Sequence, residues 1–245
     1  MLRTTVHRLL RHLGWEIHRA GRPLGTLAHV VRLIDRESIS VVLDVGANQG
    51  QFSCDLRRSG YSGRIVSFEP LSAAHRELKA TVAGDPAWTV APCMALGKKE
   101  EEVIINVANF AQASSLLRPS EDLVDMLPES IAGATETVPC HRLDHVGRKY
   151  LGTDEKALLK LDVQGFEKQV LEGAEFLLPN ISGIYIEVSV VPLYDGQALA
   201  PEILDYLYGR GFEMWYMTPG FVHPRTGRML QYDVLLARAA RPKAN

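Results

Sequence analysis

The sequence predicts an α/β fold with a mostly parallel central sheet, helices on both faces and an antiparallel terminal strand. Three observations carry this prediction. Short apolar runs alternate with helical segments over residues 41–94, as in parallel strands joined by crossover helices. Apolar runs alternate with helical segments again over residues 157–209. Apolar runs at 212–217 and 232–237 are separated only by a segment rich in turn formers, so a hairpin is expected to reverse the last strand.

Length and composition favour one main domain. A chain of 245 residues with 46% hydrophobic content can bury a full core. We expect residues 1–38 to form an N-terminal helical extension and residues 39–245 the main domain, with an insertion at about 100–140. The net charge of -2 and the aromatic content of 7% do not support a nucleic-acid partner, which usually requires a basic excess.

The cysteine pattern indicates a reduced protein. Cys54, Cys93 and Cys140 are widely spaced and contain no C-x-x-C pair. No apolar run approaches the roughly 20 residues that span a bilayer, and the N-terminus lacks the apolar stretch of a secretory signal. A cytoplasmic location is therefore expected.

The N-terminal segment has the pattern of a basic amphipathic helix. Between Leu2 and Trp15, apolar residues recur every three or four positions, and arginine and histidine occupy the other faces. This helix is expected to pack on the domain or on a partner subunit. The alternative is peripheral attachment of residues 1–20 to an anionic membrane surface. A second helix is expected at 24–35, and the sequence assigns no oligomeric state.

The stretch at 41–50 is the first indication of a ligand. An apolar strand ends in Asp44, and Gly46 and Gly50 let the backbone turn sharply and approach a ligand closely. The strand at 64–68 ends in Glu69-Pro70, where an acid can accept hydrogen bonds from both hydroxyls of a ribose. An adenosine-containing ligand is therefore expected. The first half of the expected sheet also includes helices at 51–59 and 72–82 and a third strand at 88–94.

The middle of the chain departs from this pattern. Residues 101–107 alternate polar and apolar side chains, as an antiparallel strand does, and residues 135–140 form another short strand. Residues 109–134 between them are polar and show no clear core. Long connections in compact domains are often substrate loops, so we assign the region around Ser114 to the acceptor pocket.

The second half supplies acids at strand ends. Residues 157–162 are expected to form a strand ending in Asp162, and a turn at 163–167 leads into a helix that ends near Gly173. The strand at 181–188 carries Glu187, and a helix is expected at 201–209. Because ligands bind at the carboxyl edge of an open α/β sheet, both acids are candidate site residues.

Several short motifs follow one another between residue 40 and the C-terminus. They are Asp44-Val45-Gly46-Ala47-Asn48-Gln49-Gly50, Phe68-Glu69-Pro70, Ala95-Leu96-Gly97, Ser114-Ser115, Leu143-Asp144, and Lys160-Leu161-Asp162-Val163-Gln164-Gly165-Phe166-Glu167 with Leu171-Glu172-Gly173-Ala174. In this order they resemble the FkbM family of S-adenosylmethionine-dependent O-methyltransferases. The resemblance implies a class I methyltransferase (Rossmann-like) fold, S-adenosylmethionine as methyl donor, and methylation of a hydroxyl on a sugar or a polyketide-derived product.

Two details refine the resemblance. The basic N-terminal helix and the length are similar to actinobacterial members that methylate deoxysugars of cell-envelope glycolipids. The family usually has Glu at the position of Gln164, and the neutral amide argues against a role for this position as a base or metal ligand.

The resemblance implies two groups of binding residues. The cofactor-binding residues are Asp44, Gly46, Asn48, Gly50, Glu69, Pro70, Met94, Ala95 and Asp162. Met94 and Ala95 are expected against the adenine. The acceptor-binding residues are Ser114, Ser115 and Glu187.

Asp162 is the first candidate for the general base, because a carboxylate can take the proton of a sugar hydroxyl as the C–O bond forms. The alternative is that Asp162 holds its loop or contacts the cofactor's amino group. Glu167 and His141 are further catalytic candidates, although Glu167 also suits a helix N-terminus and His141 a structural contact. A divalent cation bridging Asp162 and Glu187 is not demanded by any metal-ligand spacing.

The predicted function is O-methylation of a sugar hydroxyl, on a glycolipid or another hydrophobic glycoside. The alternatives are O-methylation of a polyketide-type small molecule and a non-catalytic scaffold that binds the cofactor or a glycolipid. An NAD-dependent oxidoreductase is a further rival, opposed by the Asp44-x-Gly46-x-x-x-Gly50 spacing, which is not G-x-G-x-x-G.

Overall fold

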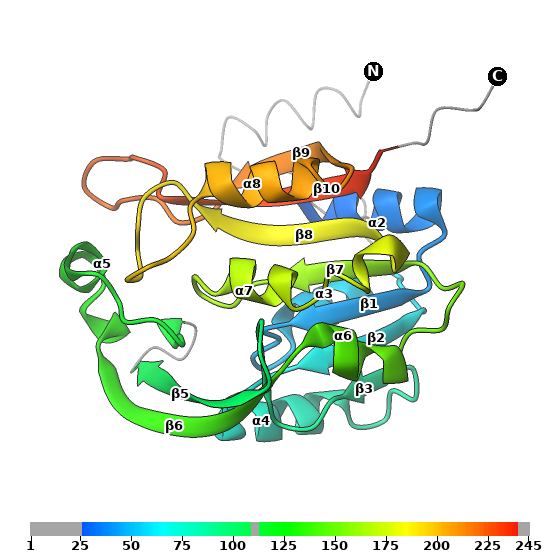
Figure 1. Cartoon of the computed structure of the whole chain (residues 1–245), viewed down its shortest axis with the longest axis horizontal. Coiled ribbons are helices and arrows are strands. Elements are labelled where there is room, and N and C mark those ends of the chain that lie inside the picture. The colour runs from blue at the N-terminus through cyan, green and yellow to red at the C-terminus, as the bar shows by residue number, and fades with distance from the viewer. Residues whose placement is uncertain (1–25, 109–112, 240–245) are drawn as a thin grey trace, which may run out of the picture.

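The central sheet has seven strands within the part of the chain that the computed structural model describes, residues 26–108 and 113–239. Their order is β3-β2-β1-β7-β8-β10-β9 (Figure 1). The strands are β1 (Val41–Val45), β2 (Arg64–Phe68), β3 (Trp88–Val90), β7 (Ala157–Leu161), β8 (Ile181–Ser189), β9 (Phe212–Pro219) and β10 (Gln231–Arg238). Strands β3, β2, β1, β7 and β8 pair in parallel, and β10 pairs antiparallel with both β8 and β9. The predicted mostly parallel sheet with an antiparallel terminal strand is confirmed.

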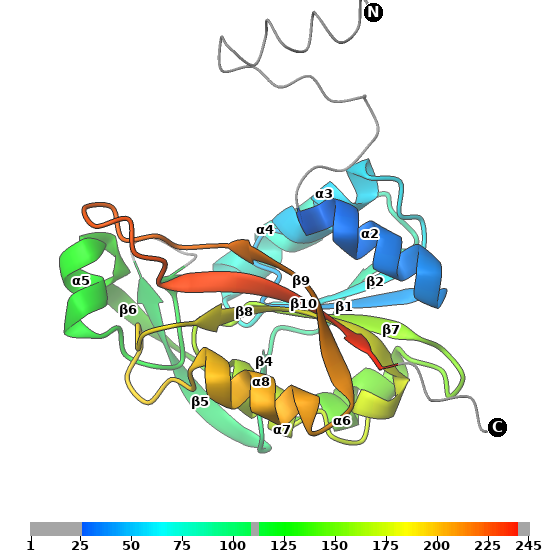
Figure 2. The same cartoon turned by 90° about the horizontal axis from the view of Figure 1, so that it is seen from above.

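Helices cover both faces of this sheet (Figure 2). One face carries α2 (Thr26–Glu37), α3 (Gln51–Arg58) and α4 (Ser72–Val82), and the other carries α6 (Leu143–Val146), α7 (Glu167–Glu172) and α8 (Ala200–Tyr208). Every residue of β1 and β7 is buried, because both faces of a central parallel strand are covered. The helix expected at 24–35 corresponds to α2, and the helix expected at 2–15 lies outside the described residues.

The third strand is shorter than expected. A strand was predicted over residues 88–94, but β3 ends at Val90, and β4 (Ala95–Leu96) belongs to a second sheet, where it pairs with β6 (Ala132–His141). Pro92 lies between them and has no backbone N–H to donate to a neighbouring strand. The chain therefore leaves the central sheet at this proline.

The insertion forms a small sheet and a helix. Strand β5 (Glu101–Ala108) pairs antiparallel with β6, which confirms the antiparallel strand predicted from the alternation. Helix α5 (Glu121–Met126) is capped by Ser120, whose hydroxyl accepts from the Leu123 N–H at 3.2 Å. Leu123 is buried against Leu193, Tyr194 and Leu230. The expectation that this segment has no core was wrong, because loops distant in sequence supply its apolar partners.

The position of the insertion is plain in Figure 1: β5, β6 and α5 lie off the carboxyl ends of the parallel strands. Sheet and insertion therefore face each other across the edge where ligands bind. None of the helices in the described ranges is long and apolar enough to cross a membrane.

Candidate functional site

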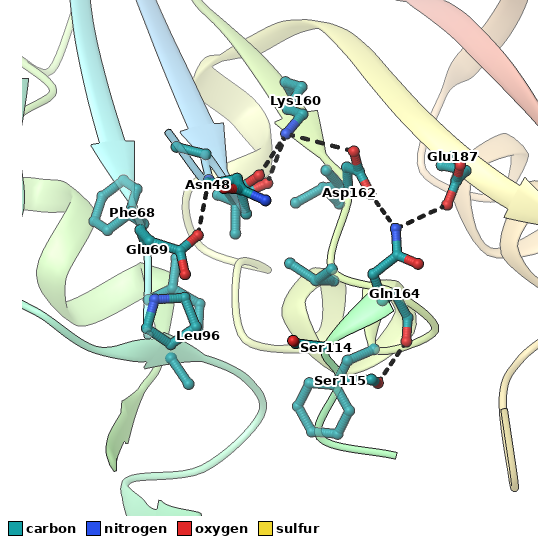
Figure 3. A pocket seen from close by; sticks show the side chains of 18 of the residues that line it. Asn48, Phe68, Glu69, Leu96, Ser114, Ser115, Lys160, Asp162, Gln164 and Glu187 are labelled. Atoms are coloured by element: carbon teal, nitrogen blue, oxygen red, sulfur yellow. Dashed lines mark hydrogen bonds and ion pairs between the residues drawn. The ribbon is translucent and has the colours of Figure 1, made fainter. Parts of the chain in front are cut away.

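A cavity of about 410 Å³ lies at the carboxyl ends of β1, β2, β7 and β8. Its lining also includes residues of β4, β5, β10 and the insertion. Figure 3 shows Glu69 on one side of this pocket and Asp162, Gln164 and Glu187 on the other. The strand order β2-β1-β7-β8 explains the separation, since Glu69 follows β2, Asp162 follows β7, and Glu187 lies on β8.

The loop after β1 approaches the loop after β7 very closely. Gly46 has φ +73°, and a Cβ atom at this position would lie 1.8 Å from the backbone oxygen of Asp162. Only glycine permits both the left-handed backbone and this approach. Gly46 lines the cavity, so the meeting of the two loops forms part of its wall.

Two residues of the same motif act behind the cavity. Asp44 is fully buried, and its carboxylate accepts a hydrogen bond from Ser53 Oγ at 2.7 Å. Gly50 has φ +92° and is the residue from which α3 begins. Neither residue lines the cavity. The structure does not bring these two predicted cofactor residues to the pocket surface; they shape the loop that forms it.

Glu69 is held in place by two backbone donors. Its Oε2 accepts from Asn48 N at 2.8 Å and its Oε1 accepts from Leu71 N at 2.9 Å. Burial raises the pKa of Glu69 to about 7, against the lowering effect of these hydrogen bonds. Asn48 has φ +49°, and its buried side-chain Oδ1 has no hydrogen-bond partner among the described residues. Both side chains line the cavity and can accept hydrogen bonds from a ligand.

The wall beside Glu69 is mostly apolar. Pro70, Met94 and Ala95, which the sequence assigned to the cofactor, all line the cavity there, together with Phe68 and Leu96. A flat aromatic base fits such a surface through dispersion and burial.

Lys160 contacts both the loop after β1 and the loop after β7. Its Nζ donates to the Gly46 carbonyl oxygen at 2.8 Å and lies 3.1 Å from Asp44 Oδ1 and 3.9 Å from Asp162 Oδ2. Burial by itself lowers the pKa of Lys160, but the carboxylates of Asp44 and Asp162 outweigh burial and raise it above its usual range. A permanent positive charge therefore lies between the β1 loop and the acid at the end of β7.

Asp162 and Glu187 are linked by a neutral amide. Gln164 Nε2 lies 2.7 Å from Asp162 Oδ1 and 3.3 Å from Glu187 Oε2, and it donates to both (Figure 3). Gln231 Nε2 donates to the same Oε2 at 2.8 Å. Burial raises the pKa of Glu187 well above its usual range, and the charge of Asp162 is the second largest cause. The charge of Asp162 thus disfavours a second charge on Glu187.

Asp233 is a third carboxylate at the cavity, and the sequence prediction missed it. It lies on β10 and accepts a hydrogen bond from the Tyr185 hydroxyl on β8. Burial raises the pKa of Asp233 above its usual range. An acid within the otherwise apolar run at 232–237 was a signal that could have identified it.

The two predicted acceptor serines differ in what they can still bind. Ser115 Oγ donates to the Gln164 backbone oxygen at 2.6 Å and accepts from Leu117 N at 3.0 Å, so its proton is already used. Ser114 Oγ accepts from Ala108 N at 3.0 Å and keeps its proton for another acceptor. Both line the cavity, but Ser114 has the greater freedom to contact a ligand.

Two catalytic candidates do not reach the cavity. His141, at the end of β6, is bonded through Nδ1 to Glu100 and is absent from the lining. Glu167 is buried and accepts from Val163 N at 3.0 Å and Gly165 N at 3.2 Å, so it holds the turn after β7. Burial raises its pKa to about 7. The helix-start alternative for Glu167 agrees with this position.

Residues 26–108 and 113–239 contain no group of three or more His, Cys, Asp or Glu arranged to hold a metal ion. The Gln164 amide lies between Asp162 and Glu187, where a bridging cation would have to bind. The structure therefore gives no support to a divalent cation at these acids.

Comparisons with known proteins give one family match. Residues 44–214 match a family model described as "Methyltransferase FkbM domain", which covers well over half of the chain. Methyltransferase sdnD of Sordaria araneosa is 25% identical over 211 residues, which are 76% of this chain and 78% of that protein. AMB antimetabolite synthetase AmbE of Pseudomonas aeruginosa is 28% identical over 205 residues, 71% of this chain but only 10% of that protein.

Among solved structures, magnesium protoporphyrin IX methyltransferase from Synechocystis PCC 6803 has a TM-score of 0.47 and 12% identity. The alignment covers 87% of this chain and 78% of that one.

Proposed function

Because the chain belongs to the FkbM methyltransferase family, we propose that it is an S-adenosylmethionine-dependent O-methyltransferase acting on a sugar hydroxyl. The sugar is carried by a glycolipid or another hydrophobic glycoside. The observation that carries this proposal is the pocket itself, with an anchored carboxylate, Glu69, on one side and the linked acids Asp162 and Glu187 on the other.

The residues around Glu69 fit an adenosine-containing methyl donor. Glu69 is fixed by two backbone donors and retains lone pairs for the two hydroxyls of a ribose. Asn48 Oδ1 is a buried acceptor that has no partner among the described residues, and a ligand donor would satisfy it. Gly46 lets the loop after β1 approach the Asp162 backbone oxygen, where a Cβ would clash. Pro70, Met94 and Ala95 would contact the base.

When bound, S-adenosylmethionine would supply the methyl group: its S–CH₃ bond would break as the C–O bond forms, and S-adenosylhomocysteine would leave. Asp162 accepts the proton of the acceptor hydroxyl as the C–O bond forms, because such a hydroxyl is too weakly acidic to lose its proton beforehand. Lys160 Nζ, 3.9 Å from Asp162 Oδ2, places a positive charge beside this carboxylate. Holding the hydroxyl in line with the methyl group is the main task of the remaining residues.

The acceptor side supports a polyhydroxylated ligand. Glu187 Oε2 receives two amide donors, whereas within the described ranges no protein donor reaches its Oε1. Asp233 and Ser114 also line the cavity. These groups suit neighbouring sugar hydroxyls, each of which donates one hydrogen bond.

Calorimetry tests the cofactor. We expect S-adenosylhomocysteine to bind and NAD not to bind, and Glu69→Ala to weaken the affinity for S-adenosylhomocysteine about 10-fold or more through the lost charged hydrogen bonds. Glu77→Ala, an exposed acid on α4, is the matched control and should leave the affinity unchanged. A preference for NAD would overturn the proposal.

Mass spectrometry tests the acceptor. Glycolipids extracted from cells that contain the protein should include a species heavier by one methylene group, absent from cells that contain Asp162→Ala. Methylation of polyketide-type alcohols in place of glycolipids would favour the first alternative function. Tight S-adenosylhomocysteine binding without methylation of any sugar, glycolipid or polyketide alcohol would favour a non-catalytic scaffold.

A further inference from the structure

Tyr194 lies under the insertion and at the edge of the site without lining the cavity. It is in the loop after β8 and is 1% exposed. Its hydroxyl is 2.9 Å from Gln164 Oε1 and 3.2 Å from the Ala113 carbonyl oxygen. Both of these atoms can only accept, so the single phenolic proton is shared between them.

This contact and the two carboxylates together set which way the Gln164 amide points. The Tyr194 hydroxyl donates to Oε1 of the Gln164 amide. With Oε1 on this side, the NH₂ group faces Asp162 and Glu187. The opposite orientation would place the amide oxygen against two carboxylates, which is repulsive. It would also leave the Tyr194 proton to the Ala113 carbonyl oxygen alone.

The backbone of Gln164 is also held. It has φ +54°, a left-handed conformation rare for a residue with a side chain, and its carbonyl oxygen accepts from Ser115 Oγ at 2.6 Å. The next residue, Gly165, has φ +97° and packs beside Tyr194. A strained backbone kept in place by neighbours is typical of functional sites.

We propose that Tyr194 and Gln164 are positioning residues: Tyr194 orients the Gln164 amide so that its NH₂ group holds Asp162 and Glu187 together as two hydrogen-bond acceptors. Gln164 is thereby a neutral bridge, and a Glu at this position would add a third negative charge to the pair. The consequence for methyl transfer rests on the proposed function, whereas the effect on the two acids does not.

The insertion contributes to the same arrangement. Ser120 N donates to the Leu193 oxygen at 2.8 Å and Asp195 N donates to the Arg118 oxygen at 2.9 Å, so residues 118–120 are bonded to the loop that carries Tyr194. Ala113 and Ser115 add the contacts to Tyr194 and Gln164 described above. The segment assigned to acceptor binding therefore supports the orientation of the amide.

Other charged groups also act on this pair. Lys160 on β7 places a positive charge near the pair, Asp233 on β10 and Glu167 at the start of α7 add negative charge, and the Tyr185 hydroxyl on β8 is hydrogen-bonded to Asp233. These groups are unchanged in Tyr194→Phe, so a change in the titration of Glu187 in that variant reports on the orientation of the Gln164 amide.

The test is a pH titration of side-chain carboxyl groups by ¹³C NMR in the free protein. Signals of Asp162 and Glu187 are assigned from Asp162→Asn and Glu187→Gln. In Tyr194→Phe the amide loses the donor that holds its oxygen, so its NH₂ group is held less firmly against the acids, which favours the protonated form of Glu187. We expect the apparent pKa of Glu187 to rise by about 1 unit. Gln164→Glu should raise it as well, through the added charge.

Tyr206→Phe is the matched control, because it removes a hydroxyl bonded to a backbone oxygen, Leu171 O at 3.2 Å, outside the cavity. It should leave the titration unchanged. Thermal unfolding and S-adenosylhomocysteine binding check that each variant is folded. Where Tyr194→Phe fails to fold, Gln164→Glu gives the same readout.

The outcomes separate the two proposals. Unchanged titration in a folded Tyr194→Phe or Gln164→Glu protein overturns the positioning role, whether or not the protein methylates sugars. A shifted titration supports it even if no sugar is methylated, in which case only the proposed function fails. With an active acceptor, Tyr194→Phe should lower kcat about 10-fold and leave the KM for S-adenosylmethionine unchanged.

Discussion

Lys160 and Asp44 form a buried ion pair near the carboxyl ends of two neighbouring strands. Nζ lies 3.1 Å from Oδ1, and the two side chains are 6% and 0% exposed. The same Nζ donates to the Gly46 carbonyl oxygen at 2.8 Å. β1 and β7 pair in register at these two residues. One lysine therefore fixes the shape of the loop that lines the predicted cofactor site.

Lys160→Met should be strongly destabilising. The substitution leaves the Asp44 carboxylate buried without its cation, which costs about 3–5 kcal/mol in comparable pairs. Urea unfolding measures the loss. Lys168→Met, which breaks a pair with Glu202 at the surface, is the control and should cost less than about 1 kcal/mol. A loss for Lys160→Met as small as that of the control would contradict the structural role.

Gly46→Ala should disrupt the loop more than the same change at Gly60. Both glycines have positive φ, +73° and +96°, but a Cβ at Gly60 meets nothing within 4 Å, whereas at Gly46 it meets Asp162 O at 1.8 Å. The backbone strain alone costs about 1 kcal/mol, and the clash adds to it. Gly46→Ala should also weaken S-adenosylhomocysteine binding at least ~10-fold. Equal effects at both positions would show that the loops separate easily.

Asp162→Ala should remove methyl transfer and leave S-adenosylhomocysteine affinity largely intact. Loss of a general base costs about 10²–10⁴-fold in rate. Asp154→Ala, an exposed acid in a loop before β7, is the control. Turnover that survives in Asp162→Ala shows that Asp162 is not the base, and a large loss of affinity indicates instead a contact to the cofactor.

The free protein should become more stable as the pH falls from about 7 to about 5. Burial raises the pKa of Glu69 and of Glu167 to about 7. In this range the folded state binds these protons while the unfolded state, with ordinary carboxyl pKa values, does not, so the free energy of unfolding rises as pH is lowered. Unfolding by urea at several pH values measures this slope. Glu69→Gln should make this slope smaller. An unchanged slope would show that burial does not raise the pKa of Glu69.

Removal of residues 1–20 tests the membrane alternative. The basic amphipathic pattern predicts that the full chain binds vesicles containing anionic phospholipid and that the truncated chain binds them less. Sedimentation with vesicles of neutral lipid is the control. Equal binding of the two chains would reject the attachment.

The confirmed predictions concern local or periodic patterns. The strands and helices of the core follow from apolar runs, glycines and their spacing. The position of a single side chain does not follow from such patterns. His141 is bonded to Glu100 outside the cavity, and Glu167 holds a turn, because a side chain at a strand end points according to the pleat and the local turn.

The sequence by itself determined the α/β class, the antiparallel last strand and the resemblance to a methyltransferase family, since these depend on patterns within short stretches. Only the tertiary structure decided that Asp233, Tyr194 and Gln231 meet Asp162 and Gln164 at one site. Strand β10 enters the sheet beside β8, and the loop after β8 pairs with the insertion. These contacts join residues far apart in the chain, and no local pattern encodes them.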